Sequence, residues 1–252
     1  MTTAAQHPVS QTVGDRILVR GRDLADELIG SMTFTEMFLF DLTGQVPTRS
    51  HVRIVDAVLV TLMEHGITPS TLAARLVIDG APESTEGAVA AGLLAVGSRF
   101  LGVIEQVATV CGEICTADGG DLPTSARAFV DSARAAGTKV PGFGHNLHEK
   151  DPRVVRLLEL ADGEGAVGPH LRALQAVDRC LNDGTGAPLA MNAAGVIGAL
   201  LADLGYGPSA IRGFGLVARS AGLLAHVVDE RANPIARGVW QRAHESFGRD
   251  TT

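Results

Sequence analysis

The chain has 252 residues, of which 46% are hydrophobic and 19% are charged, and its formal net charge is −7. A chain of this length buries a full-sized core without a disulfide or a metal ion, and the composition excludes a largely disordered protein. The acidic balance, without a run of lysines or arginines, gives no electrostatic basis for binding nucleic acid or an anionic membrane surface. We therefore expect no nucleic-acid partner and no membrane partner.

The cysteines and the first residues bear on metal content and location. Cys111 and Cys115 lie four residues apart with no second pair to complete a zinc site, and Cys180 is the third. We interpret all three as small buried residues in a reducing compartment and expect no metal. Residues 1–12 have no basic stretch followed by an apolar one, so we expect a cytoplasmic protein. A membrane span needs roughly 20 apolar residues, and the most apolar segments are too short for that or are interrupted by a charged residue. These segments are 52–63, 88–96, 189–204 and 214–228.

Apolar residues recur at three- and four-residue intervals from the start of the chain, over residues 18–28, 34–43 and 51–65. This spacing predicts helices, and no segment keeps the strict alternation of a half-buried strand. Thr33 is placed to cap the second of these helices, with Glu36 in the capping-box position, and Gly44 ends it.

The same periodicity continues to the C-terminus, so the predicted fold class is all-α. The further helices are predicted at 69–76, 83–96, 101–113, 125–136, 152–161, 168–181, 188–204, 208–228 and 237–246. The glycine-rich breaks between them are too short to be interdomain tethers, which favours one domain over residues 1–252. Alanine and glycine within 189–204 and 214–228 allow close helix packing, inside the molecule or across a homodimer interface.

The strongest local signal is Pro141-Gly142-Phe143-Gly144-His145, which Arg153 follows. The two glycines permit a tight turn and leave backbone amides open to a ligand. At its end, His145 is placed to donate to an oxyanion, and the guanidinium of Arg153 suits a carboxylate. The alternative is a plain helix connector with a surface histidine.

Two further positions are candidates for ligand binding. His65 comes at a predicted helix C-terminus before a glycine, where a histidine is also a common structural cap. Arg219 lies within the apolar segment 214–228, and a buried guanidinium needs an anion. A substrate carboxylate would supply that anion, as would a salt bridge to Asp203 or Asp229.

The histidine spacings do not favour a metal site. His226, Asp229 and Glu230 share a helical face, but no second histidine lies four residues away, so we expect a solvated face. The remaining histidines are interpreted as surface residues: His7, His51, His148, His170 and His244. The sequence also has no dinucleotide-binding glycine motif, Walker loop or Gly-x-Ser-x-Gly elbow.

Taken together, these motifs resemble a known family. The Pro-Gly-Phe-Gly-His turn with Asp-Pro-Arg at 141–153 is similar to the signature loop of citrate synthases, and His65-Gly-Ile-Thr-Pro-Ser-Thr resembles their other histidine turn. The segment 91–102, which contains Arg99-Phe100, resembles the citryl-CoA lyase module of ATP-citrate lyase, and 218–229 continues the likeness. The chain length is closest to that of a stand-alone citryl-CoA lyase.

The resemblance implies an all-α homodimer with a large and a small lobe, the small lobe spanning roughly residues 108–205. It implies a coenzyme A thioester in the cleft and cleavage or formation of a carbon–carbon bond beside it, with release of acetyl-CoA and an oxo acid such as oxaloacetate. By the same resemblance His65 and His145 polarise the oxo-acid part, and Arg153 and Arg219 bind carboxylates. The cofactor-binding residues that it implies are Pro141, Gly142, Phe143, Gly144 and Asn192.

The sequence departs from the family pattern at two places. Phe100 stands where a citrate synthase has a histidine, although the lyase module also has phenylalanine there. Ala194 stands where the family has its catalytic aspartate, and a methyl group cannot transfer a proton; loss of such a group costs on the order of 10²–10⁴ in rate. Asp183, Asp203 or a bound water would have to replace it. The alternatives are a different acyl-CoA or β-dicarbonyl substrate, a non-catalytic acyl-CoA or carboxylate-binding protein, or, least favoured, an inert helical interaction protein.

Overall fold

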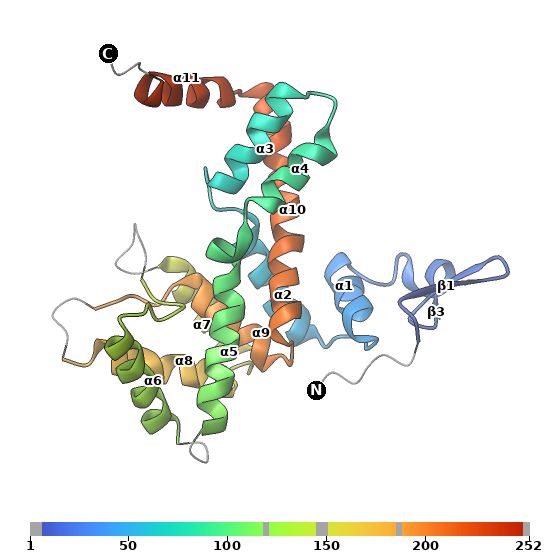
Figure 1. Cartoon of the computed structure of the whole chain (residues 1–252). Helices are drawn as coiled ribbons and strands as arrows, with labels where there is room; N and C mark the ends of the chain where they lie inside the picture. The colour runs from blue at the N-terminus through green and yellow to red at the C-terminus, as the bar shows by residue number, and fades with distance from the viewer. Residues whose placement is uncertain (1–6, 118–120, 145–150, 185–187, 249–252) are drawn as a thin grey trace.

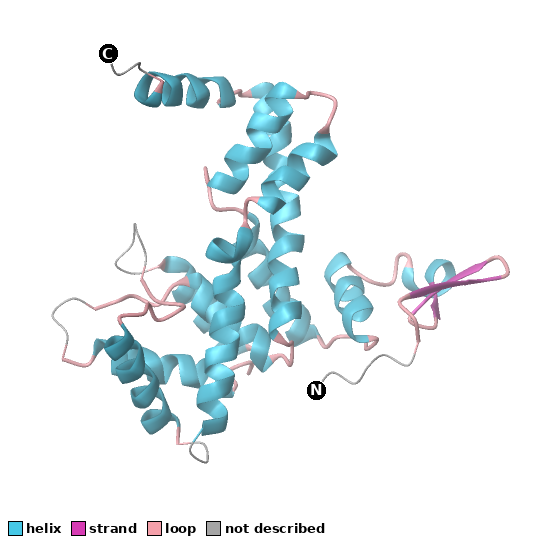
Figure 2. Cartoon of the chain, viewed as in Figure 1, coloured by secondary structure: helices cyan, strands magenta, loops and turns pink. Residues whose placement is uncertain are grey.

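The chain is mostly helical (Figures 1 and 2), as the periodicity predicts. The structure is a computed structural model and describes residues 7–117, 121–144, 151–184 and 188–248. After a small N-terminal sheet the helices are α1 (Phe34–Thr43), α2 (Arg49–Met63), α3 (Pro69–Gly80), α4 (Thr85–Leu94), α5 (Gly102–Thr116), α6 (Leu122–Ala136), α7 (Pro152–Gly163), α8 (Pro169–Asn182), α9 (Ala193–Asp203), α10 (Pro208–Ala232) and α11 (Ala236–Phe247).

The helix predicted at residues 18–28 is wrong for residues 18–23, and only residues 24–28 are helical. The segment instead contributes to an antiparallel sheet of β1 (Ser10–Val13), β2 (Arg16–Val19) and β3 (Arg22–Asp23), followed by the short helix η1 (Leu24–Leu28). Val13 pairs with Arg16 across a two-residue loop that begins at Gly14, whose φ is 61°. A Gly-Asp pair between short apolar runs is a hairpin signal, and it overrides the helical spacing of residues 18–23.

Helix α1 begins and ends where its capping residues predict. The Thr33 hydroxyl accepts from the Glu36 amide at 3.2 Å, and the Glu36 carboxylate accepts from the Thr33 amide at 2.7 Å. At the other end Gly44 has a φ of 72°, in the left-handed region that favours glycine. The predicted capping box is therefore confirmed.

Helix α10 is the longest helix and packs against α2, α3, α4 and α5 (Figure 1). It begins at Pro208 as predicted and has 25 residues, ending beyond the predicted 228, and by length and composition alone it is sufficient to cross a membrane. It also buries Arg219, His226 and Glu230. Ionisable side chains buried against neighbouring helices are features of a protein core, so we interpret α10 as a core helix.

Helices α5 to α9 gather beside the lower part of α10 in Figure 1. Helix α9 packs closely on α5 because Gly198 has no side chain: a Cβ there would lie 2.5 Å from the Ile104 carbonyl oxygen. Helix α8 packs on both α5 and α9. The predicted small lobe, 108–205, includes α6 to α9 and most of α5, and its boundaries stay a prediction.

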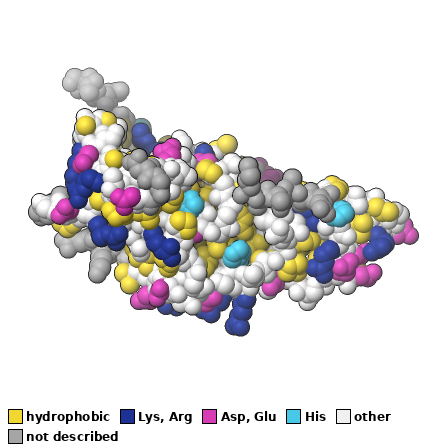
Figure 3. Space-filling model, turned by 90° about the horizontal axis from the view of Figure 1, so that it is seen from below, with side chains coloured by type: hydrophobic (Ala, Val, Ile, Leu, Met, Phe, Trp, Pro, Cys, Tyr) yellow, Lys and Arg dark blue, Asp and Glu magenta, His cyan; other side chains and the backbone are white. Residues whose placement is uncertain are grey.

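The surface seen in Figure 3 has small groups of Lys and Arg side chains lying among Asp and Glu side chains, with hydrophobic side chains exposed between them.

The three cysteines are free thiols: Cys111 and Cys180 are buried, and Cys115 is partly buried. Burial raises the pKa of the Cys111 thiol to about 12. A thiol that stays protonated in this way behaves as a small apolar side chain, as the sequence indicated.

Candidate active site

A pocket opens where the end of α2, the starts of α3, α7 and α9, the middle of α10 and the short helix η2 (Gly97–Leu101) meet, and its cavity volume is about 270 Å³. Three of the residues singled out in the sequence, His65, Arg153 and Arg219, line it. Among the described residues its lining includes arginine and histidine but no carboxylate: Thr61, Leu62, His65, Thr68, Pro69, Ser70, Val96, Arg99, Phe100, Leu101, Val103, Arg153, Asn192, Ala193, Ala194 and Arg219. The lining therefore suits an anion.

Arg219 is the most unusual of these side chains. Its residue is only 9% exposed, and its Nε and Nη1 atoms are buried without a hydrogen-bond partner. Burial lowers the pKa of the guanidinium, and the charge of Glu64 opposes that shift. The salt bridges considered from the sequence are not formed, because Asp229 pairs with Arg75 and Asp203 with His170. A buried cation with unpaired donors is costly, and a ligand carboxylate in the pocket would satisfy it.

Arg153 is held in place by Asp151 at the start of α7. The Asp151 carboxylate accepts from Arg153 Nε at 2.9 Å and from Nη2 at 2.8 Å, and it also accepts from the Ala193 amide at 3.3 Å. Burial alone would raise the pKa of this carboxyl group, but the hydrogen bonds from Arg153 outweigh it and the pKa is lowered. On the other side, Arg153 Nη1 lies 3.1 Å from His65 Nδ1. The guanidinium thus stands between Asp151 and His65 at the pocket wall.

The turn at 141–144 is joined to the start of α9. Phe143 pairs with Met191, the Gly144 amide donates to the Ala190 carbonyl at 2.8 Å, and the Asn192 amide donates to the Gly142 carbonyl at 2.9 Å. The expectation that backbone amides here stay open is thus wrong for Gly144. Gly142 has a φ of 85°, and a Cβ there would lie 2.9 Å from the Gly195 α-carbon, so this close approach requires glycine.

Asn192 caps α9, which begins at Ala193 and not at 188 as predicted. Its side-chain oxygen accepts from the Gly195 amide at 3.1 Å, and its side-chain nitrogen donates to the Gly144 carbonyl at 3.0 Å. An asparagine is a strong N-cap, which explains the later start. Asn192 also lines the pocket, whereas His145 and His148 lie outside the described residues.

Ala194 and Phe100 both line the pocket, so the two departures from the family pattern occur at the site itself. Neither aspartate considered as a replacement for the missing acid lines this pocket. Asp183 pairs with Arg127 at 2.8 Å. Asp203 caps α8 by accepting from the Gly168, His170 and Leu171 amides. Asp203 is thus a structural cap, and His170, which bonds to it, is only partly exposed.

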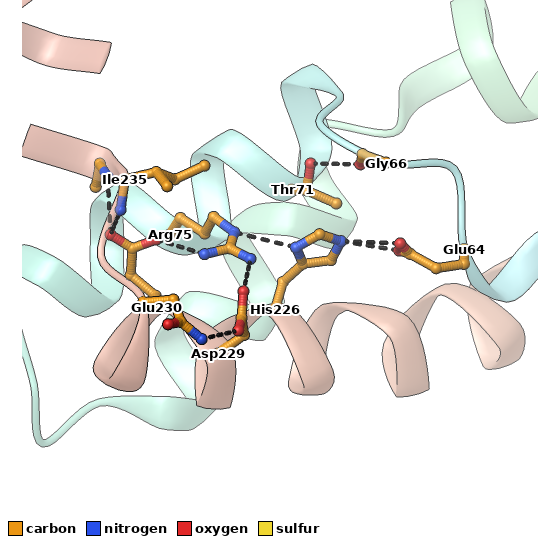
Figure 4. Close-up of polar contacts among 10 residues, drawn as sticks. Glu64, Gly66, Thr71, Arg75, His226, Asp229, Glu230 and Ile235 are labelled. Carbon is orange, nitrogen blue, oxygen red and sulfur yellow. Dashed lines mark hydrogen bonds and ion pairs between the residues drawn. The ribbon is translucent and has the colours of Figure 1, made fainter. Parts of the chain in front are cut away.

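Arg99 also lines the pocket, next to Phe100, although no motif in the sequence predicts a site role for it. The predicted solvated face is wrong for His226 and Glu230, which are buried. Figure 4 shows them in a network with Arg75, Asp229 and Glu64. The sequence signal for this network is Arg75, which follows two alanines in α3. An arginine on a buried helix needs an acidic partner. Among the described residues no group of side chains has the arrangement of a metal site.

A mostly helical fold with arginines in a pocket where several helices meet is an arrangement that suits small carboxylates. The profile of "Citrate synthase, C-terminal domain" matches residues 4–238, so the chain belongs to the citrate synthase family. Among solved structures it is similar to citryl-CoA lyase from Hydrogenobacter thermophilus, at 31% identity and a TM-score of 0.81, over 89% of this chain and 86% of that one. The fold is also that of ATP citrate lyase from Methanothrix soehngenii, solved in complex with citrate and coenzyme A, at 21% identity and a TM-score of 0.76, over 92% of this chain and 40% of that one.

Curated relatives agree with these likenesses. The ATP-citrate synthase beta chain protein 1 of Arabidopsis thaliana is 25% identical over 209 residues, which are 75% of this chain and 33% of that protein. The chain therefore spans about a third of the length of that relative.

Proposed function

We propose that this protein cleaves or forms a carbon–carbon bond beside a coenzyme A thioester, in the manner of a citryl-CoA lyase. The favoured reaction takes citryl-CoA to acetyl-CoA and an oxo acid such as oxaloacetate. The observation that carries the proposal is the buried Arg219, whose Nε and Nη1 have no partner in a pocket that also contains Arg153, Arg99 and His65. The likeness to a citryl-CoA lyase of similar length supports the choice of reaction.

In this proposal the arginines bind the carboxylates of the substrate. Arg219 offers two unpaired donor nitrogens to a carboxylate. Arg153 is already oriented by Asp151, and this preorganisation limits the entropy lost when a flexible polyanion binds. His65 lies against Arg153 and is assigned to the oxygen on the carbon that is cleaved. His145 is assigned to the same oxygen on the strength of the sequence resemblance.

The reaction needs two proton transfers. The substrate hydroxyl group loses its proton, the adjacent carbon–carbon bond breaks, and the bonding electrons pass to the thioester side as an enolate. The enolate carbon then takes up a proton to give acetyl-CoA. Ala194 can perform neither transfer, so we assign the hydroxyl proton to an imidazole and the enolate proton to water.

Coenzyme A is proposed as the thioester carrier, with the 141–144 turn and Asn192 near its reactive end. The residues present fit an acyl chain, because Val96, Phe100 and Leu101 add apolar surface to the pocket that the arginines also line. No metal is included in the proposal.

Ala194 favours a second candidate function. A pocket that keeps its cations and has a methyl group in place of a proton-transfer group would still bind a carboxylate or an acyl-CoA. The protein would then be a non-catalytic binding homologue, or it would act on another acyl-CoA or a β-dicarbonyl compound whose cleavage does not need that acid.

The test is incubation of the purified protein with citryl-CoA. Oxaloacetate release is measured with a coupled dehydrogenase, and acetyl-CoA release is measured by chromatography. We expect both products in equal amounts, and loss of turnover in Arg219→Gln and His145→Ala. Turnover unaffected by both substitutions would reject the roles assigned here. Calorimetric binding of citrate or coenzyme A with no turnover on any thioester would favour the binding homologue.

We further propose that the protein is a homodimer in the cytoplasm. Helices α3, α4 and α10 expose large apolar side chains, among them Leu76, Leu94, Leu224 and Val228. Such side chains on neighbouring helices favour burial against a second copy. Light scattering coupled to size exclusion should give twice the chain mass, and Leu94→Lys with Val228→Lys should give the monomer.

A further inference from the structure

Three residues on one face of α10 connect the pocket to the end of α2. Arg219, Gly222 and His226 are spaced by three and four residues, so they lie one above another on the helix. Arg219 lines the pocket. A Cβ at Gly222 would lie 2.0 Å from the Met63 carbonyl oxygen, and His226 Nε2 lies 2.8 Å from Glu64 Oε1. The helix that carries Arg219 thus also contacts the two residues that precede His65.

The hydrogen bonds of His226 fix its tautomer. Arg75 Nε lies 3.0 Å from His226 Nδ1, and a guanidinium nitrogen can only donate, so Nδ1 is the acceptor. The ring proton is therefore on Nε2, which donates to Glu64. Figure 4 shows this line of contacts from Arg75 through His226 to Glu64.

The far end of the network is anchored in the core. Arg75 Nη1 donates to Glu230 at 2.6 Å and Nη2 donates to Asp229 at 2.5 Å. The other oxygen of Glu230 accepts from the Ile235 and Ala236 amides at 2.8 Å each, at the start of α11. Arg75 and Glu230 are both 3% exposed, whereas the Glu64 side chain is 56% exposed. The network therefore starts from the buried pair Arg75 and Glu230 and ends on an exposed side chain next to His65.

The segment that Glu64 begins forms one wall of the pocket. His65, Thr68, Pro69 and Ser70 all line the cavity. Its other end is held to α4, where Ser70 Oγ donates to the Gly92 carbonyl at 2.7 Å, and within the segment Thr71 Oγ1 donates to the Gly66 carbonyl at 3.1 Å. Hydrogen bonds thus hold the wall at both ends, and the one between Glu64 and His226 holds the end next to α2.

We propose that His226 is a positioning residue that acts through Glu64: it holds the wall of residues 64–70 beside Arg219 and Arg153 and so sets the affinity of the pocket for a carboxylate ligand. The identity of that ligand rests on the proposed function. The wall connects His226 to the pocket, since His65 in the wall has its Nδ1 atom 3.1 Å from Arg153 Nη1. If the wall moved away, a ligand bound by the arginines would lose its contacts with His65.

The negative charge of Glu64 should weaken the binding of an anionic ligand, whereas its hydrogen bond to His226 should strengthen that binding. Its negative charge acts on Arg219, so removing the charge alone should favour an anion. Removing the hydrogen bond to His226 should loosen the wall and weaken binding. Glu64→Gln removes only the charge, because the amide oxygen still accepts, whereas Glu64→Ala removes both.

The experiment compares citrate binding by calorimetry with hydrogen–deuterium exchange of residues 62–71 in the full-length protein. We expect Glu64→Ala and His226→Leu to weaken citrate binding on the order of ten- to a hundredfold and to speed exchange in this segment. We expect Glu64→Gln to bind citrate at least as tightly as the wild type. His226→Gln should retain wild-type binding, since its oxygen can accept from Arg75 and its nitrogen can donate to Glu64. The exposed Glu113 on α5 provides the matched control, Glu113→Ala.

Unchanged citrate affinity and unchanged exchange in folded Glu64→Ala would overturn the proposal. Equal weakening by Glu64→Gln and Glu64→Ala would also overturn it, because the effect would then belong to the charge. Glu64 is exposed, so its variants should fold even where His226→Leu does not. If the wild-type protein binds no citrate, the proposed function fails, while the exchange comparison still decides whether the network holds the wall.

Discussion

Gly222 on α10 and Met63 at the end of α2 approach so closely that a Cβ on the glycine would lie 2.0 Å from the Met63 carbonyl oxygen. In an ordinary helix, Gly→Ala stabilises by roughly 1 kcal/mol. Here the contact is to backbone, which cannot turn aside as a side chain can. We expect Gly222→Ala to lower the free energy of unfolding by about 1–3 kcal/mol, measured by denaturant titration.

The same helix contains a matched control. Gly213 has nothing within 4 Å of the position that a Cβ would take. Gly213→Ala should therefore raise the free energy of unfolding by roughly 0.5–1 kcal/mol. Equal effects of the two substitutions would show that α10 does not approach α2 as closely as described.

Arg219 should lower the stability of the ligand-free protein while it enables ligand binding. Replacing it by methionine removes a buried guanidinium with unpaired nitrogens, and we expect the free energy of unfolding to rise by about 1–3 kcal/mol. Citrate at a hundred times its dissociation constant should stabilise the wild type by about 2.7 kcal/mol and leave the variant unaffected.

A partly exposed arginine of the same helix gives the comparison. Arg212 pairs with Glu105 at 3.3 Å, and Arg212→Met should change stability by less than about 1 kcal/mol and leave the citrate effect intact. If Arg219→Met proved less stable than the wild type, the guanidinium would have to be satisfied within the protein.

Ala194 allows a gain-of-function test. If citryl-CoA cleavage is limited by the missing proton-transfer group, Ala194→Asp should raise turnover on the order of 10²–10⁴, measured as acetyl-CoA release at saturating substrate. Ala194→Asn has a side chain of the same size that exchanges no proton, and it should leave turnover low. An active wild type that neither substitution accelerates would mean that another group already transfers the proton.

Asp151 should contribute a pH-dependent part of the stability. Its carboxyl pKa is lowered from 3.8, so the stabilisation is complete above that value and is lost as the pH falls below it and through the folded-state pKa. We expect Asp151→Asn to cost about 1–3 kcal/mol at pH 7 and to show a smaller loss of stability between pH 5 and acid than the wild type.

The control for this titration is Asp121, an exposed residue at the start of α6 whose side chain makes no capping hydrogen bond. Asp121→Asn should keep the wild-type dependence of the melting temperature on pH. An Asp151→Asn protein with the same acid dependence as the wild type would contradict the assigned role of the carboxylate.

The helices were predictable because their signals are local. The periodicity and the Thr33 and Gly44 caps act within one or two turns, and α1 ends where they indicate. The signal for the N-terminal hairpin is just as local, because the Gly14-Asp15 loop outweighs the helical spacing of residues 18–23.

Periodicity and the cost of burying charge depend on nearby residues, so the helical fold and a buried arginine that requires an anion can be predicted from the sequence. That His65, Arg153 and Arg219 share one pocket, and that His226 bonds to Arg75 and Glu64, is evident only once the chain is folded. Arg75 and His226 are 151 residues apart, and Glu64 and His226 are 162 apart. No local pattern encodes such pairs, since they arise from the packing of α10 against α2 and α3.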